Sequence, residues 1–292
     1  MASISPPLST PAVTNFRDVA QTINASKPQP TLNPGLFYRS ALPSTASPTA
    51  RANLTTIYNI KTILDLRSDT EIAEQDQQQQ SKHSTPTSTP QTPSPKTAHI
   101  SLNGSAYSLA LIKQLPYHQT LKLALLYTLP SYRTQAISIL GKNVMTARGL
   151  SGLAIDTLTH STSEIARVFT LLADSANYPV LVHCTQGKDR TGLVVLLVCL
   201  VCGVGAEGLE EDYMRSEVEL APEREARVRE IAKIGLPAGF AGCEEGWVGV
   251  VRGWLEREWG GVGGYLEGAC GVERETVESV RKVLVAREGG GE

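Results

Sequence analysis

A ten-residue stretch, residues 183–192 with the sequence HCTQGKDRTG, constrains this chain more than any other part of it. The short apolar run at residues 179–182 before it is typical of a buried strand, and the apolar run at residues 193–201 after it has the length of a helix. The spacing therefore predicts a strand, a tight loop and the start of a helix. Backbone N–H groups in such a loop and at a helix N-terminus bind anions. We expect a phosphate-binding loop.

Two side chains of this loop stand in the spacing Cys-x5-Arg. Arg190 can bind two phosphate oxygens at once through its planar guanidinium, which a lysine cannot do. Cys184 lies at the base of the loop, where positive potential favours the nucleophilic thiolate form. We expect Cys184 to act as a nucleophile and Arg190 to hold the phosphate. The alternative, a buried structural cysteine beside solvent-facing charges, leaves the flanking residues without a role.

The other loop residues are expected to shape the loop and to bind phosphate through their backbone N–H groups: Thr185, Gln186, Gly187 and Lys188. Gly187 permits a sharp turn. Thr191 stands where its hydroxyl can donate to the sulfur and help it leave in a second step. His183 either orients the loop through hydrogen bonds or is a core histidine with satisfied hydrogen bonds, and the sequence leaves both open.

The loop resembles that of the cysteine-based protein tyrosine phosphatase superfamily, and more narrowly that of the atypical tyrosine and lipid phosphatases of bacteria and fungi, which reads HCxxGKDRTG. Other segments are similar to words of that family: residues 15–18 (NFRD), 35–40 (GLFYRS), 62–68 (TILDLRS) with Glu71, 213–216 (YMRS), 263–266 (GGYL) and 271–272 (GV). The resemblance implies a phosphatase that hydrolyses phosphotyrosine through a phosphocysteine intermediate and uses no metal or cofactor. Phosphoserine, phosphothreonine and phosphoinositides are further candidate substrates.

The general acid is the least settled role. Most members of the superfamily use an aspartate on a separate mobile loop, often in a Trp-Pro-Asp context, and this sequence lacks that tripeptide. The resemblance implies that Asp189, inside the loop, is the acid. Asp65, at the end of an expected strand, and Asp156 are the alternatives. Lys188 is expected to engage additional negative charge, as a lysine there does in phosphoinositide phosphatases.

Several other functions use a similar loop. A phosphoinositide phosphatase remains an alternative, whereas the joint presence of Cys184, Asp189 and Arg190 disfavours a phosphate-binding pseudophosphatase. The Lys-Asp-Arg-Thr-Gly ending disfavours sulfur transfer. Arsenate reduction would require a second thiol, and the nearest in sequence, Cys199, is expected to be buried. Cys199 and Cys202 form a C-x2-C inside an apolar run, which we interpret as buried thiols rather than a metal site.

The chain is expected to form a single phosphatase domain over residues 13–288, preceded by a mobile tail at residues 1–12 that is no signal peptide. Residues 75–97 contain no aliphatic or aromatic side chain and four prolines, so we expect a disordered insert there. The longest apolar run, residues 193–204, is too short for a membrane span. Five cysteines without a framework spacing favour a reducing compartment, and we expect a cytoplasmic monomer.

The expected fold is α/β: a central, mostly parallel sheet flanked by helices, like that of tyrosine phosphatases, with a helical C-terminal half. Strands are expected near residues 36–39, 61–66, 99–102 and 180–183. A capping box at residues 161–164 predicts a helix over residues 165–172.

The charge is divided unevenly along the chain. The first 206 residues carry 16 Lys and Arg against 10 Asp and Glu, and the rest carry 11 against 19. The half that contains the loop is thus basic, which suits a phosphorylated protein or a phosphoinositide substrate. The total of −2 argues against general binding of nucleic acid.

Overall fold

The computed structural model describes residues 13–25, 31–82 and 94–286. Five strands form one sheet in the order β1-β2-β5-β3-β4. Their bounds are β1 (Arg17–Asp18), β2 (Phe37–Ser40), β3 (Thr62–Asp65), β4 (Lys96–His99) and β5 (Val180–His183). Only β1 runs antiparallel to its neighbour. The predicted α/β fold with a mostly parallel sheet is confirmed.

Helices make up most of the remaining described chain. They are α1 (Val19–Asn24), α2 (Pro48–Thr56), α3 (Asp69–Lys82), α4 (Ser105–Lys113), α5 (Tyr117–Tyr127), α6 (Arg133–Leu140), α7 (Thr146–His160), α8 (Thr162–Ala173), α9 (Asp189–Val201), α10 (Ala206–Leu220), α11 (Arg224–Lys233), α12 (Trp247–Trp259), α13 (Val262–Gly264) and α14 (Arg274–Leu284). Short 3-10 or π turns join several of them, including η5 (Ala221–Glu223) and η6 (Ala238–Ala241). None of the helices in the described segments is long and apolar enough to cross a membrane.

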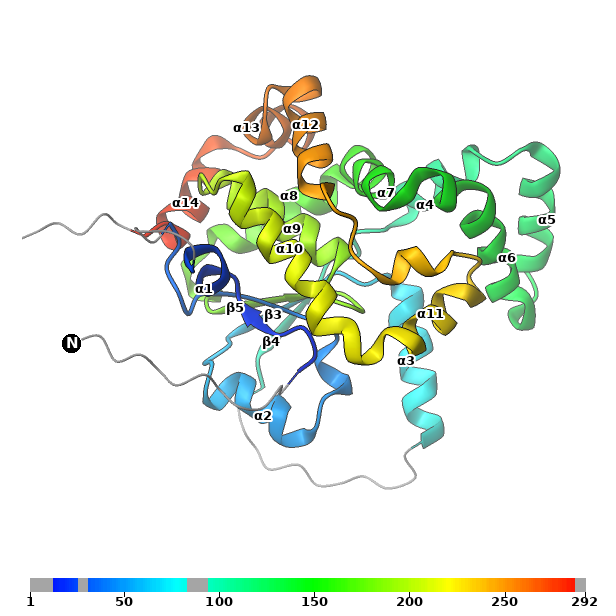
Figure 1. Ribbon diagram of the computed structural model, residues 1–292, viewed down its shortest axis with the longest axis horizontal. Coiled ribbons are helices and arrows are strands. Elements are labelled where there is room, and N and C mark those ends of the chain that lie inside the picture. The colour runs from blue at the N-terminus through cyan, green and yellow to red at the C-terminus, as the bar shows by residue number, and fades with distance from the viewer. Residues whose placement is uncertain (1–12, 26–30, 83–93, 287–292) are drawn as a thin grey trace, which may run out of the picture.

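The two faces of the sheet bury different apolar residues, because side chains alternate along a strand. Val180 and Val182 belong to the main core, together with apolar residues of α8 and α9. Leu181 lies between them in sequence and joins a smaller cluster with Tyr38 of β2 and Leu54 of α2. Figure 1 shows α8, α9 and α10 on one side of the sheet and α2 on the other. The sheet is thus held between helical layers.

The central helix α9 begins directly after the loop of residues 184–188 and is buried along nearly its whole length. A helix that is apolar all round must be surrounded by protein. The sequence predicted this helix over residues 193–201, and the structure confirms it and extends it back to Asp189. Beside it, Tyr213 of α10 stacks on Trp247 of α12 with ring centroids 4.5 Å apart.

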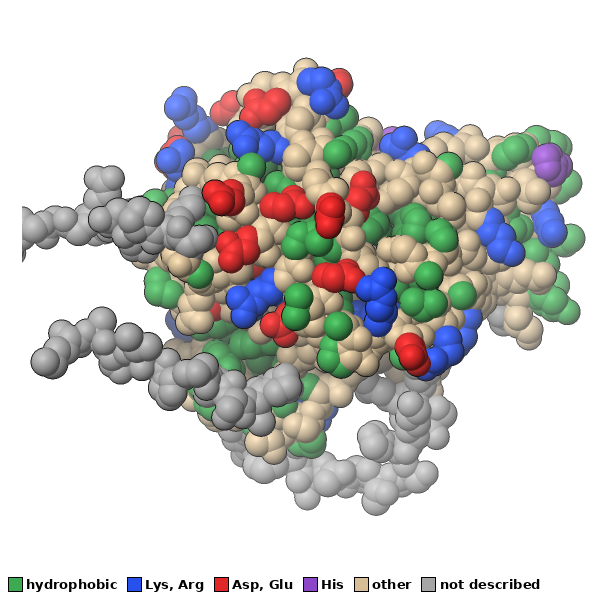
Figure 2. All heavy atoms as spheres, in the orientation of Figure 1, with side chains coloured by type: hydrophobic (Ala, Val, Ile, Leu, Met, Phe, Trp, Pro, Cys, Tyr) green, Lys and Arg blue, Asp and Glu red, His purple; other side chains and the backbone are tan. Residues whose placement is uncertain are grey.

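Helices α4 to α7 form a separate apolar cluster away from the sheet, visible at the right of Figure 1. Leu111, Leu123 and Ile139 are among its buried members. On the outer side of α5, apolar side chains lie exposed to solvent, and Figure 2 shows them over that helix.

Two expectations about the polar insert at residues 75–97 are wrong. Its first part continues α3, since glutamine, glutamate and lysine are good helix formers. Its last part belongs to β4, which pairs with β3 from Lys96 to His99 rather than lying at residues 99–102. Pairing uses backbone groups and therefore tolerates polar side chains at this edge strand. Residues 83–93 and the expected tail at residues 1–12 lie outside the described residues, and the domain boundaries stay a prediction.

The helix predicted from the capping box is present as α8, but the box itself does not form. Ser161 precedes α8 without bonding its N-terminal amides, and its hydroxyl donates instead to the carbonyl of Leu102. This bond ties α8 to the segment that follows β4. The Ser161 hydroxyl therefore makes a tertiary hydrogen bond instead of the local one that a capping box requires.

Candidate active site

The predicted phosphate loop lies where three parallel strands end. Ser40 of β2 and Asp65 of β3 are both in register with His183, the last residue of β5. In open α/β sheets, ligands bind outside the carboxyl ends of the strands. Residues 184–188 leave β5 at this edge, and α9 begins immediately after them.

Gly187 allows the loop to pass close to the end of β2. Its φ of 67° lies in the left-handed region, and a Cβ placed on it would be 2.1 Å from the carbonyl oxygen of Ser40. The backbone N–H of Leu42 also donates to the carbonyl of Thr185 at 3.2 Å. The turn that the sequence assigned to Gly187 is therefore required by both its conformation and its close neighbour.

Two side chains hold the carbonyl groups of the loop. The amide nitrogen of Asn15 donates to the carbonyls of Gln186 and Gly187, both at 3.0 Å. Arg39 donates to the carbonyl of Gly187 at 2.7 Å and to that of Lys188 at 3.4 Å. In a trans peptide the N–H points opposite to the C=O. Holding these carbonyls on one side therefore turns the N–H groups of Gly187, Lys188 and Asp189 to the other side of the loop.

Arg39 is itself held by a buried carboxylate. Asp212 of α10 accepts a hydrogen bond from Nη1 of Arg39 and another, at 2.8 Å, from Nε of Arg17. All three side chains are buried. Burial alone would raise the pKa of Asp212, but the two arginines hold it below its usual value, so the carboxylate stays charged. A buried charge of this kind is stable only when it is paired.

Arg190 meets a carboxylate of α3. Its Nη1 donates to Oε2 of Glu71 at 2.6 Å and its Nη2 donates to Oε1 at 2.7 Å. Burial alone would lower the pKa of Arg190, but the hydrogen bonds and charge of Glu71 raise it above its usual range. A guanidinium has five N–H groups. The contact with Glu71 leaves Nε and one N–H of Nη2 along one edge without a partner in the described chain, which is the edge that binds a phosphate bidentately.

Glu71 is fixed from several sides. Its carboxylate accepts hydrogen bonds from the backbone N–H of Ser68 and the hydroxyl of Ser68, both at 2.9 Å, and from the hydroxyl of Thr185 at 2.7 Å. Burial would raise the pKa of Glu71, whereas Arg190, Ser68 and Thr185 together hold it far below its usual value of 4.5. The DLRS-x-x-E segment thus connects β3 to the loop arginine.

The three candidate acids differ in their partners. Asp65 is held by a fork of hydrogen bonds from Arg67, the shortest 2.6 Å, and Asp156 by two from Arg148, at 2.7 and 2.8 Å. Burial would raise the pKa of Asp65, but Arg67 holds it below its usual value. Asp189 lies in the first turn of α9, and its buried Oδ1 has no hydrogen-bond partner among the described residues. Within the described chain, Asp189 therefore lacks the two-pronged arginine contact that holds each of the other two carboxylates.

Lys188 was expected to engage additional negative charge on a substrate, but its side chain lies elsewhere. Its side chain is fully buried, and its ammonium donates to the backbone carbonyls of Phe240, at 2.9 Å, and Gly242. The same ammonium lies 3.6 Å from a carboxylate oxygen of Asp189. The lysine therefore joins the loop to η6, and it cannot reach a substrate without giving up these bonds.

The remaining site residues lie within the loop region as well. Cys184 is buried, and Nδ1 of His183 donates to its carbonyl at 3.0 Å, so the histidine orients the start of the loop. Burial lowers the pKa of His183 and keeps it neutral. The hydroxyl of Thr191 is buried without a hydrogen-bond partner in the described segments. The expected bond from Thr191 to the sulfur is absent here, and its role stays a prediction.

Sequence reasoning did not assign Asn15, Arg17, Arg39, Glu71 or Asp212 to the site. Four of them lie in the segments that resemble family words, and Asp212 immediately precedes one. Their signal was their place in or next to these segments, but sequence alone did not show that the segments meet at the loop.

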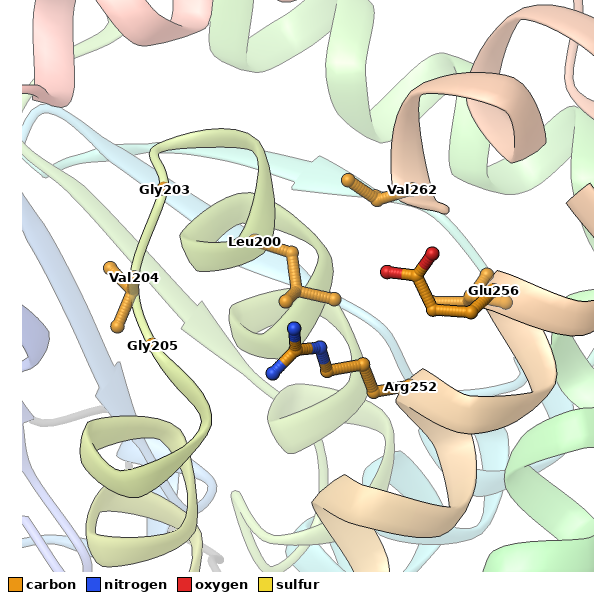
Figure 3. A pocket seen from close by; sticks show the side chains of 8 residues that line it. Leu200, Gly203, Val204, Gly205, Arg252, Glu256 and Val262 are labelled. Carbon is orange, nitrogen blue, oxygen red and sulfur yellow. The ribbon is translucent and has the colours of Figure 1, made fainter. Parts of the chain in front are cut away.

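A cavity of about 280 Å³ lies at the other end of α9, between the turn after this helix and α12 (Figure 3). Leu200, Arg252 and Glu256 are among its lining residues. A helix of this length spans roughly 20 Å. The cavity contains no residue of the loop and is not part of the candidate site.

Replacing Gly187 by alanine should weaken anion binding. The added methyl group would collide with the carbonyl of Ser40 and force the loop away from β2. We expect the affinity for inorganic phosphate, measured by calorimetry, to fall on the order of tenfold or more, or about 1.4 kcal/mol per tenfold. Gly203→Ala is the control, because Gly203 also has a positive φ but no atom near its would-be Cβ. Equal phosphate affinity in both variants would show that the close approach is unimportant.

Glu71→Gln should lower both phosphate affinity and thermal stability, since it removes the charge that orients Arg190. The pKa of Glu71 is depressed in the folded protein, so its contribution to stability is complete above about pH 4.5 and is lost only as the pH falls further. The Tm difference from the unmodified protein should therefore be constant near neutral pH and shrink in acid. Asp76→Asn, at an exposed position of the same helix, serves as the control. A Tm difference that grows in acid would contradict this account.

The comparisons with known proteins agree with this geometry. The sequence model described as the tyrosine phosphatase family matches residues 8–286. The chain is 30% identical over 299 residues to the triple specificity protein phosphatase PtpB of Mycobacterium tuberculosis, covering 94% of this chain and 98% of that one. It is 28% identical over 172 residues to a tyrosine-protein phosphatase of Nostoc commune, covering 53% of this chain and 58% of the other. The chain therefore belongs to the tyrosine phosphatase family.

Proposed function

We propose that this enzyme hydrolyses phosphotyrosine esters through a phosphocysteine intermediate on Cys184. The observation that carries the proposal is the shape of the loop at the carboxyl edge of the sheet. Asn15 and Arg39 hold its carbonyls on one side, and Arg190 keeps one guanidinium edge without a partner in the described chain. Such a site offers several donors to three phosphate oxygens and has a thiol at its base.

The reaction proceeds in two displacements. The Cys184 thiolate attacks phosphorus, the bond from phosphorus to the ester oxygen breaks, and the departing oxygen takes a proton from Asp189. A water molecule then attacks the phosphocysteine, the carboxylate of Asp189 takes its proton, and the S–P bond breaks to release inorganic phosphate and the thiolate. Arg190 and the loop amides stabilise the equatorial oxygens in both transition states.

The absence of an arginine contact among the described residues supports Asp189 as the acid, and its Oδ1 lies 3.6 Å from the Lys188 ammonium. Asp65 and Asp156 would each have to leave a two-pronged arginine contact before giving a proton. Burial would raise the pKa of Asp65, but Arg67 outweighs burial and holds this pKa below its usual value, which makes Asp65 a poor proton donor. Asp189, in the first turn of α9, has no comparable arginine contact in the described segments.

Protein substrates are favoured over lipid ones. The relative from Mycobacterium tuberculosis is named for triple specificity, which supports further substrates beside phosphotyrosine here. The main sequence argument for phosphoinositides was Lys188, whose ammonium is engaged by backbone carbonyls. We further propose a monomer that works in the cytoplasm, where free thiols such as these five persist.

Arsenate reduction lacks support, because it would require a reactive second thiol. Cys199 is fully buried in α9, and burial raises its pKa well above the usual value. Burial likewise raises the pKa of Cys202 to about 12. Both thiols are poorly ionised and face the core, as the sequence predicted for the C-x2-C pair.

Cys184→Ser should abolish turnover and preserve binding. A serine hydroxyl ionises too weakly to attack, whereas the loop amides and Arg190 remain. We expect a fall in kcat on the order of a thousandfold or more on para-nitrophenyl phosphate, with phosphate affinity retained. Cys243→Ser, at a half-buried free cysteine, is the control. A wild-type protein that binds phosphate but does not turn over would identify a pseudophosphatase.

Asp189→Asn should slow esters with poor leaving groups far more than activated ones. The loss expected for a general acid is roughly 10²- to 10⁴-fold on phenyl phosphate. Para-nitrophenyl phosphate, whose leaving group barely needs a proton, should be affected much less. Asp65→Asn and Asp156→Asn should slow both esters to the same degree. If one of those two variants shows the leaving-group dependence instead, the acid is that residue.

A further inference from the structure

A groove of about 600 Å³ runs along one side of the phosphate loop. Thr185 and Gln186 belong both to the loop and to the wall of this groove. The other lining residues come from the N-terminal segment, the chain after β2, the start of α3, and η5 with α11: Thr14, Ala41, Leu42, Thr45, Ala46, Ser47, Arg67, Glu71, Glu74, Gln75, Glu223, Ala226, Arg227 and Glu230. The part of a substrate next to its phosphate must therefore pass over these residues.

The charge of this groove is acidic, although the half of the chain that contains the loop is basic. Four glutamates and two arginines are among its lining residues, and both arginines have carboxylate partners. Arg67 pairs with Asp65, and Arg227 pairs with Glu223 at 2.6 Å. The basic character expected from the sequence does not extend to the surface beside the loop.

Two of the four glutamates remain without a cation. Glu71 is engaged by Arg190, and Glu223 by Arg227. Glu74 of α3 and Glu230 of α11 are exposed and form no ion pair with any residue that the structure describes. Their charges face solvent on two helices that line the same groove, so a ligand seated there is the nearest possible source of a partner.

Some polar side-chain atoms of the lining residues have no hydrogen-bond partner in the described chain. Arg227 is buried, yet its Nε and Nη1 have no acceptor in the described chain. The side-chain oxygen of Gln186 is buried and lacks a donor. A peptide backbone brings both carbonyl acceptors and N–H donors. An inositol phosphate would place further anions beside Glu74 and Glu230.

Part of the groove lining is apolar. Ala41, Leu42, Ala46 and Ala226 contribute small or aliphatic surface. Lysine and arginine can lay their methylene stems along such surface while their charged ends reach a carboxylate. The lining thus offers a basic side chain both apolar surface for its stem and glutamates for its charge.

We propose that this groove binds the peptide segment that flanks the phosphotyrosine and prefers lysine or arginine there. Glu74 and Glu230 would form the ion pairs with these basic side chains. The inference rests on the proposed phosphatase function and names the substrate class of the same site. It also predicts that polyphosphorylated inositides are disfavoured, because their additional phosphates would be repelled by the glutamates of the groove.

The test uses two phosphotyrosine peptides that differ only in flanking arginine or flanking glutamate. The readout is the ratio of their kcat/KM values, which is independent of the fraction of active enzyme. We expect the arginine peptide to be preferred roughly three- to tenfold, the scale of one or two exposed ion pairs. Glu74→Gln with Glu230→Gln should bring the ratio close to one, and the corresponding double change to lysine should invert it.

Salt provides a second readout, because the screening length falls from about 10 Å at 0.1 M to about 3 Å at 1 M. The preference should shrink with added salt in the wild type and be insensitive to salt in the glutamine variant. Glu275→Gln, an exposed glutamate of α14, is the matched control and should retain the full ratio. A ratio that is the same in wild type and double variant overturns the inference.

The same assays separate failure of the inference from failure of the proposed function. If wild type hydrolyses neither peptide nor para-nitrophenyl phosphate, the phosphatase function itself is wrong. If it hydrolyses both peptides without preference, only the groove inference is wrong. A water-soluble phosphoinositide hydrolysed with higher kcat/KM than the arginine peptide would also overturn it. Faster phosphoinositide hydrolysis by the double glutamine variant, starting from a low wild-type value, would support it.

Discussion

The contact between Arg39 and the phosphate loop is the interaction on which the site depends. A loop of backbone amides that all face one anion is unfavourable on its own, because its carbonyls must then face the protein and find donors there. Arg39 and Asn15 provide these donors, and Asp212 neutralises the arginine within the core. The conformation of the loop therefore depends on a buried ion pair that lies outside the loop itself.

A second ion pair serves the opposite side of the loop. Glu71 accepts hydrogen bonds from the two terminal nitrogens of Arg190 and from the hydroxyl of Thr185, so it connects the arginine to the start of the loop. Fixing a guanidinium in advance reduces the reorganisation needed when charge develops on the phosphate. The two networks approach the loop from different strands, β2 and β3, on either side of β5.

The sequence was sufficient for those features that are local. The loop, β5 and α9 are contiguous, so apolar runs and one motif predicted the strand, the loop and the helix around Cys184 and Arg190. The surroundings were not predictable in the same way. The direction of Lys188 depends on η6, which follows it by some fifty residues, and β4 exists because backbone groups pair with β3 despite its polar side chains. The acidic groove combines residues from segments that are far apart in the sequence, so the local net charge of each segment did not show that their glutamates lie together.

The sequence positions of the residues that support the loop have a consequence during translation of the chain. Asn15 and Arg39 come from the start of the domain, whereas Asp212 follows the loop in α10. When residues 183–192 first leave the ribosome, the carboxylate that holds Arg39 in place has not yet been made. The oxyanion pocket can therefore form only after the chain has been extended through α10. A nascent or prematurely terminated chain carries the cysteine motif without the buried carboxylate that holds Arg39, so the order of translation delays the complete arrangement of the loop until α10 has been made.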